Sequence, residues 1–181
     1  MIETVGIFLK RNLRRQARRV LLTTHPYLAG VISILVVFYS DIRIVPSSLS
    51  SVFIPYDTVV FGFTATAIAL AIAIPSERFV TFLSGIKDGS TPFRDFLFVL
   101  AWNGLVHIVA FFLFLPFVFL PAQWVLDVGG DLSWSKIYVS LMLWVQVYAC
   151  FQFLVTTLGV YELADVYAAY CARERRKAEN Q

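Results

Sequence analysis

The chain alternates long apolar segments with short polar ones. Segments without a formally charged residue run from Val20 to Ser40, Thr58 to Ser76, Phe96 to Leu126 and Ile137 to Tyr161. A helix needs about 20 apolar residues to cross the ~30 Å hydrocarbon core of a bilayer, and spanning strands would instead alternate with a period of two. The pattern therefore predicts an all-α integral membrane protein built as a bundle of four transmembrane helices. We place the spans at about residues 24–45, 57–75, 93–120 and 134–161.

The composition supports a membrane protein. Of the 181 residues, 59% are hydrophobic and 17 are Phe, and the mean hydropathy is +0.73. Soluble domains contain about 45–50% apolar residues, so this chain has too few polar residues to cover a soluble globule. We divide it into an N-terminal helix at 3–22, a membrane domain at 24–165 and a cytoplasmic helical extension with a basic tail at 162–181.

Basic residues predict the orientation. All but two of the 15 Lys and Arg residues precede the first span, lie between spans two and three, or follow span four. Lys and Arg favour the cytoplasmic side, so we expect both termini in the cytoplasm of a bacterial inner membrane. Arg43 and Lys136 fall on the outer side, where we also place Asp57. The four spans are then expected to hold no buried formal charge, which disfavours an energised transporter.

The N-terminal segment 3–22 reads as a basic amphipathic helix. Its cationic face consists of Arg11, Arg14, Arg15, Arg18 and Arg19. Such a helix binds anionic lipid headgroups, docks an acidic cytoplasmic protein, or resembles a calmodulin target. Because the basic positions flank membrane segments, we expect no direct nucleic-acid site.

The second span has an unusually thin surface. A stripe of small residues is formed by Gly62, Ala65, Ala69 and Ala73. Small residues let helices approach closely in lipid, which predicts packing within or between subunits. The alternative is a pore-lining helix in which the hydroxyls of Thr64 and Thr66 face water.

Polar residues near the middle of the spans form a candidate belt or pore lining: Thr64, Thr66, Asn103, His107, Gln146 and Gln152. Spans three and four run in opposite directions, which places Gln146 at the depth of His107 and Gln152 at the depth of Asn103. The belt predicts interhelical hydrogen bonds, the wall of a wet cavity or ion path, or a proton relay or pH sensor at His107.

The segment from Trp134 to Lys177 contains no Pro and predicts one continuous helix. Beyond the span, an apolar stripe is formed by Leu163, Val166, Tyr167 and Tyr170. This stripe needs a neighbour, and the cytoplasmic loop, a sister subunit or another protein would each provide one. A short interfacial helix is expected in that loop, around Phe79 to Ile86.

Catalytic and metal-binding patterns are missing from the sequence. The two His residues do not lie near Cys, Asp or Glu at metal-ligand spacing, and no phosphate loop or nucleophile elbow occurs. We therefore expect no enzyme activity, no cofactor and no metal site. The two cysteines, Cys150 and Cys171, give no disulfide framework.

These features favour an oligomeric inner-membrane sensor or anchor that couples the bilayer to a cytoplasmic protein partner. The alternative is a homo-oligomeric ion channel or membrane-permeabilising pore. We expect a homo-oligomer, with a tetramer as the working number, in contact with membrane lipids. The size, the four-span layout and the lack of an outer domain resemble small membrane subunits of bacterial phage-defence systems, such as the Kiwa membrane component. That resemblance implies an envelope sensor working with a cytoplasmic effector in antiviral defence.

Overall fold

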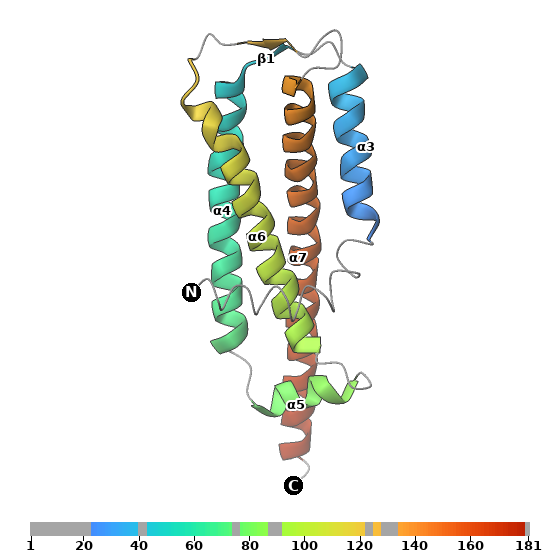
Figure 1. Cartoon of the computed structure of the whole chain (residues 1–181). Coiled ribbons are helices and arrows are strands. Elements are labelled where there is room, and N and C mark those ends of the chain that lie inside the picture. The colour runs from blue at the N-terminus through green and yellow to red at the C-terminus, as the bar shows by residue number, and fades with distance from the viewer. Residues whose placement is uncertain are drawn as a thin grey trace, which may run out of the picture. The chain divides into compact units, whose positions relative to one another are not determined.

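The structure is a computed structural model, and it describes residues 23–39, 43–73, 77–86, 92–121, 125–127 and 134–179. Nearly all of these residues are helical (Figure 1). The helices and strands are α3 (Thr24–Tyr39), β1 (Arg43–Ile44), α4 (Pro46–Ala73), α5 (Glu77–Ile86), α6 (Pro92–Val118), β2 (Leu126–Asp127) and α7 (Trp134–Glu179). The predicted basic helix at 3–22, with its five arginines, lies outside the described residues.

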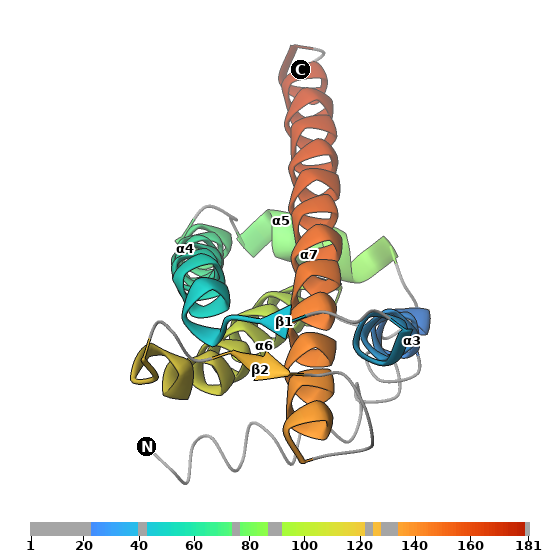
Figure 2. The same cartoon turned by 90° about the horizontal axis from the view of Figure 1, so that it is seen from above.

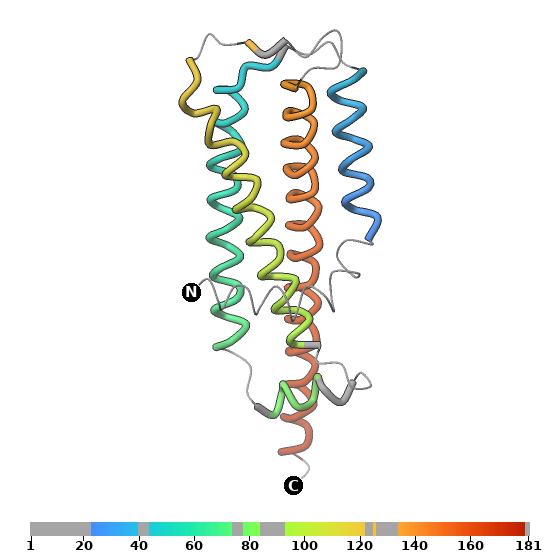
Figure 3. Tube along the Cα trace, in the orientation of Figure 1, coloured from blue at the N-terminus to red at the C-terminus, as the bar shows by residue number. Residues whose placement is uncertain are grey.

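Within this described part, three helices are long and apolar enough to cross a membrane, namely α4, α6 and α7. Helix α3 has 16 residues, about 24 Å at 1.5 Å per residue, and is shorter than the first span that the sequence predicts. The continuous helix predicted from Trp134 is confirmed, because α7 runs unbroken for 46 residues (Figure 3).

Helix α4 begins earlier than the sequence predicts. The span predicted at about residues 57–75 left residues 46–55 outside the helix, and this boundary is wrong, because the helix starts at Pro46. Proline is favoured at the first helical position, where its missing N–H has no intrahelical partner anyway. The amides of Ser48 and Leu49 bond the carbonyl of Val45 and close the first turn. Pro55 lies inside the helix, as proline does more often in membrane helices than in soluble ones.

The described residues fall into two compact units. The first comprises residues up to Thr58 together with Val106–Phe151, and the second comprises Val59–Leu105 and the residues from Gln152 onward. Helices α4, α6 and α7 each contribute one part to both units.

In the first unit, α3 packs against the first half of α7. The Ser33 hydroxyl donates to the carbonyl of Ser140 at 2.5 Å, and the Trp144 indole N–H donates to the carbonyl of Pro26 at 2.8 Å. The strands β1 and β2 pair antiparallel, with Arg43 opposite Asp127 (Figure 2). They therefore tie the segment between α3 and α4 to the segment between α6 and α7.

In the second unit, the amphipathic helix α5 packs on the last part of α7. Phe79 of α5 is 1% exposed, and its ring meets those of Tyr167 and Tyr170 at centroid distances of 4.8 and 5.3 Å. Phe82 also contacts Tyr170, at 5.2 Å. The predicted interfacial helix is therefore present, and two members of the predicted stripe have a neighbour within the chain.

Several polar side chains are buried beside the hydrophobic core, while many large apolar side chains are exposed. Asn103 and His107 on α6 are fully buried, whereas Phe112 on the same helix is 61% exposed. Val59 on α4 and Leu158 on α7 are also largely exposed. Polar side chains inside and large apolar side chains outside are compatible with helices that face lipid.

Candidate functional site

The first unit contains a buried polar cluster to which α4, α6 and α7 each contribute one residue. His107 Nδ1 lies 2.7 Å from Asp57 Oδ1, and the Gln146 amide donates to the same oxygen at 3.2 Å. The three side chains are 0–1% exposed. Removing an unpaired carboxylate from water costs several kcal/mol, which explains why Asp57 has two partners on one oxygen.

All three residues lie at the same depth within the unit. Asp57 is about 17 Å along α4 from Pro46, His107 about 17 Å along α6 from Val118, and Gln146 about 18 Å along α7 from Trp134 by helix rise. The distance from the end of each helix to its polar residue is thus roughly half the ~30 Å thickness of a hydrocarbon core.

Neighbouring side chains complete the environment. The Tyr56 ring meets the His107 imidazole edge-on at 5.7 Å, and the Tyr56 hydroxyl hydrogen-bonds the Cys150 thiol. Elsewhere in the first unit, the Phe53 ring packs on that of Phe114 at 4.9 Å. An aromatic ring, that of Tyr56, therefore lies directly against the cluster.

Each member of the cluster has hydrogen-bonding capacity left over. Asp57 Oδ2, His107 Nε2 and Gln146 Oε1 are buried and have no hydrogen-bond partner. With Asp57 ionised, Nδ1 of His107 is the donor to it, so Nε2 is the ring atom that can gain or lose a proton. Buried polar atoms without a partner are uncommon in proteins, so these three atoms need an explanation.

The second unit contains a neutral counterpart of this cluster. The Asn103 amide donates to Thr64 Oγ1 at 2.8 Å, and the Thr64 hydroxyl in turn donates to the carbonyl of Val60 at 2.8 Å. Gln152 and Thr156 of α7 are also buried, at 5% and 1% exposure. Asn103 Oδ1 and Thr156 Oγ1 have no partner, but none of these groups titrates near neutral pH.

The structure thus divides the predicted polar belt. His107 and Gln146, predicted at one depth, meet through Asp57, while Thr64 and Asn103 meet each other. Thr66 belongs to neither group, because it is exposed and bonds the carbonyl of Gly62 in its own helix.

The predicted small-residue stripe also lies on an exposed face. Gly62, Ala65, Ala69 and Ala73 are all exposed, and a Cβ added at Gly62 would meet nothing within 4 Å. Their packing between copies of the chain stays a prediction.

Asp57 is the residue that sequence reasoning missed. We expected no buried formal charge in the spans, and this expectation is wrong, because Asp57 is 1% exposed and paired with His107. We treated each charged residue as the end of an apolar segment, so Asp57 was placed at the boundary of the second span. Helical spacing was the available signal, since Asp57 and Val60 lie on the face of Thr64, and all three are buried.

In the part of the chain that the structure describes, no three His, Cys, Asp or Glu side chains are grouped so that they could hold a metal ion. No protein-family model, curated protein or solved structure matches the chain. The resemblance to phage-defence membrane subunits therefore stays a prediction, and any function must be argued from the two polar groups.

Proposed function

We propose that the chain is a proton-responsive sensor subunit of a bacterial inner membrane, with Asp57, His107 and Gln146 as its proton-binding site. The observation that carries this proposal is the fully buried Asp57–His107 pair, whose atoms Oδ2 and Nε2 have no partner. Ionisable residues inside a membrane are costly, and they commonly mark proton relays and ion pathways.

The proposed proton acceptor is His107 Nε2. When the imidazole is neutral and its Nδ1–H donates to the Asp57 carboxylate, the cluster carries one net negative charge. A proton that binds the Nε2 lone pair converts the cluster to an imidazolium–carboxylate pair with no net charge. Because net charge is expensive in a low-dielectric interior, the two states differ in the packing that they favour.

The membrane topology that we propose has four spans and cytoplasmic termini. Helix α3 would form the first span with the help of the residues that flank it. Two observations support this arrangement: the bias of Lys and Arg, and the pairing of Arg43 with Asp127, which the charge distribution places on the same outer side.

Helix α7 is the proposed route from the cluster to a cytoplasmic protein partner. It continues without interruption from Gln146 to the basic turn at Arg173–Lys177. A shift of α7 that accompanies proton binding would reach the cytoplasmic end through one rigid element, and the partner would respond to that shift. An antiviral effector is the partner that the predicted resemblance implies.

A titration of labelled histidine tests the proton site. With ¹⁵N-histidine, the purified protein has two imidazole signals, from His25 and His107, and His107→Gln assigns them. The spectra are recorded from about pH 8 to pH 5, and we expect Nε2 of His107 to gain a proton reversibly within this series in the wild type and to behave differently in Asp57→Asn. Thr66→Val, outside the cluster, serves as the control. A His107 signal that stays unchanged over this range would overturn the proposal.

The second candidate function is a homo-oligomeric channel or membrane-permeabilising pore. The exposed face of α4 favours it, because small side chains and the Thr66 hydroxyl lie together there. Proton and potassium flux into liposomes separates the two functions. A sensor leaves the vesicles sealed, whereas a pore conducts, and bulky replacement at Ala69 blocks it.

A further inference from the structure

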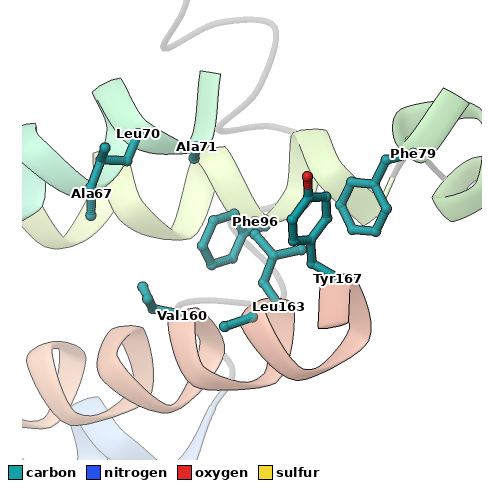
Figure 4. A pocket seen from close by; sticks show the side chains of 9 residues that line it. Ala67, Leu70, Ala71, Phe79, Phe96, Val160, Leu163 and Tyr167 are labelled. Carbon is teal, nitrogen blue, oxygen red and sulfur yellow. The ribbon is translucent and has the colours of Figure 1, made fainter. Parts of the chain in front are cut away.

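We propose that the second unit binds one acyl chain of an anionic membrane lipid in an apolar cavity between α4, α5, α6 and α7. The cavity has a volume of about 230 Å³. Figure 4 shows side chains from these four helices converging on it, among them Ala67, Ala71, Phe79, Phe96 and Leu163. The inference does not depend on the proton site.

Small residues create the space. Ala67 and Ala71 lie one helical turn apart on α4 and leave room that larger side chains would occupy, while Phe79 and Phe96 wall the cavity from α5 and α6. Apart from the Tyr167 hydroxyl, the lining side chains carry only carbon atoms. A hydrocarbon chain matches this lining, whereas a polar ligand would lose its hydrogen bonds there.

Cationic residues are close in sequence to the cavity residues. Arg78 adjoins the cavity residue Phe79, and Arg94 lies two residues before Phe96; both are exposed. The pKa of Glu174 is lowered first by its hydrogen bond to Lys177 and then by the charges of Lys177, Arg78 and Arg173, so cations of α5 and of the end of α7 act on the same carboxylate. Basic residues beside the cytoplasmic ends of membrane helices bind anionic headgroups.

The location also favours a lipid over another occupant. The cavity is lined by the last turns of α4, the first turns of α5 and α6, and α7 just beyond Val160, which is where the apolar segments meet charged residues. An acyl chain enters such a site from the bilayer without unfolding, and each buried methylene contributes about 0.8 kcal/mol, or roughly fourfold in affinity.

Photo-crosslinking tests the site. The full-length protein is reconstituted in vesicles of phosphatidylcholine with a trace of phosphatidylglycerol that carries a diazirine on one acyl chain, and labelled peptides are mapped. We expect labels on the cavity residues of α4, α6 and α7. The same probe on phosphatidylcholine should label them at least about fivefold less, since each nearby cation contributes about 1 kcal/mol.

Matched variants separate the acyl chain from the headgroup. Ala71→Leu fills part of the cavity and should lower labelling about tenfold, because the larger side chain displaces roughly two methylenes of the acyl chain. The control Ala168→Leu makes the same change on an exposed part of α7 outside the cavity. Arg78→Gln should reduce only the preference for phosphatidylglycerol, by about fivefold. Equal labelling of wild type and Ala71→Leu, or cross-links that join two copies of the protein at the cavity, would overturn the proposal.

Discussion

The two units use the same three helices but bury different chemistry. In the first unit, Asp57, His107 and Gln146 form a cluster that contains two ionisable side chains at a separation of 2.7 Å. In the second, Thr64 and Asn103 form a neutral pair at 2.8 Å, and aromatic rings join α5 to α7. Neutral hydrogen bonds suffice to hold membrane helices together, so the costly ions of the first unit call for another explanation. This difference between the units is the reason why we place the proposed proton site in the first unit.

The largest expected effect follows from removing the imidazole from the buried pair. His107→Leu leaves the buried Asp57 carboxylate without one of its two partners and should destabilise the protein by about 3–5 kcal/mol, measured by unfolding in detergent micelles. The double variant Asp57→Leu, His107→Leu should recover most of this loss, because an apolar pair has no charge to desolvate. If the free energy of unfolding of the single variant lies within about 1 kcal/mol of the wild-type value, the pair is not a buried ionic site.

The next largest effect should arise in the second unit. Phe79 is 1% exposed and contacts the rings of Phe82, Tyr167 and Tyr170. Phe79→Ala should cost about 3 kcal/mol, the lower end for a buried Phe, because the adjacent cavity already leaves space. We expect faster amide exchange in α5 and no change in the His107 titration. Phe82→Ala, at a partly buried position, should lower the free energy of unfolding by less. Equal losses in the two variants would contradict the view that Phe79 is the main contact between α5 and α7.

A smaller effect is expected for the neutral pair. Asn103→Leu removes one interhelical hydrogen bond and should cost about 0.6–1.7 kcal/mol, the range found for such bonds in membrane proteins. The loss should be the same at about pH 5 and pH 8, since neither Asn nor Thr titrates there. The Thr66 hydroxyl bonds only a carbonyl of its own helix, so Thr66→Val should hardly change the free energy of unfolding. A pH-dependent loss in Asn103→Leu would break the distinction between the units.

Periodicity and apolar length predicted most of the helices. The absence of Pro after Trp134 correctly predicted a single helix to the end of α7. Counting residues along two helices of opposite direction predicted Gln146 at the level of His107, and in the structure both side chains contact Asp57. Both results follow from regular helix rise, which depends little on tertiary contacts.

The remaining features depend on packing that one sequence does not encode locally. The start of α4 was missed because Pro46 and the following serines also suit a loop, and the helix forms there through bonds to Val45. Likewise, Ala occurs at 65, 67, 69, 71 and 73, so either face of α4 could have been the buried one. The neighbours α6 and α7 decide that Ala67 and Ala71 line a cavity while Ala69 is exposed.

The smallest effect concerns the last turns of α7. Lys177 Nζ donates to Glu174 Oε1 at 2.7 Å, and this bond lowers the pKa of Glu174. A lowered pKa in the folded state means that the stabilisation is complete above the unfolded value of about 4.3 and is lost as the pH falls through the folded value. The protection of the amides of residues 173–179, relative to their intrinsic exchange rate at each pH, should therefore fall slightly between about pH 5 and pH 3. Glu174→Gln should abolish this dependence.

The same variant tests whether the exposed pair is a local feature. An exposed ion pair contributes little to stability, so Glu174→Gln should leave the His107 titration unchanged. Coupling between sites is reciprocal, which means that a cluster sensitive to the end of α7 would in turn act on that end. A displaced His107 titration in Glu174→Gln would therefore contradict a purely local role for the pair, and it would place the coupling element of the proposed sensor in the last turns of α7.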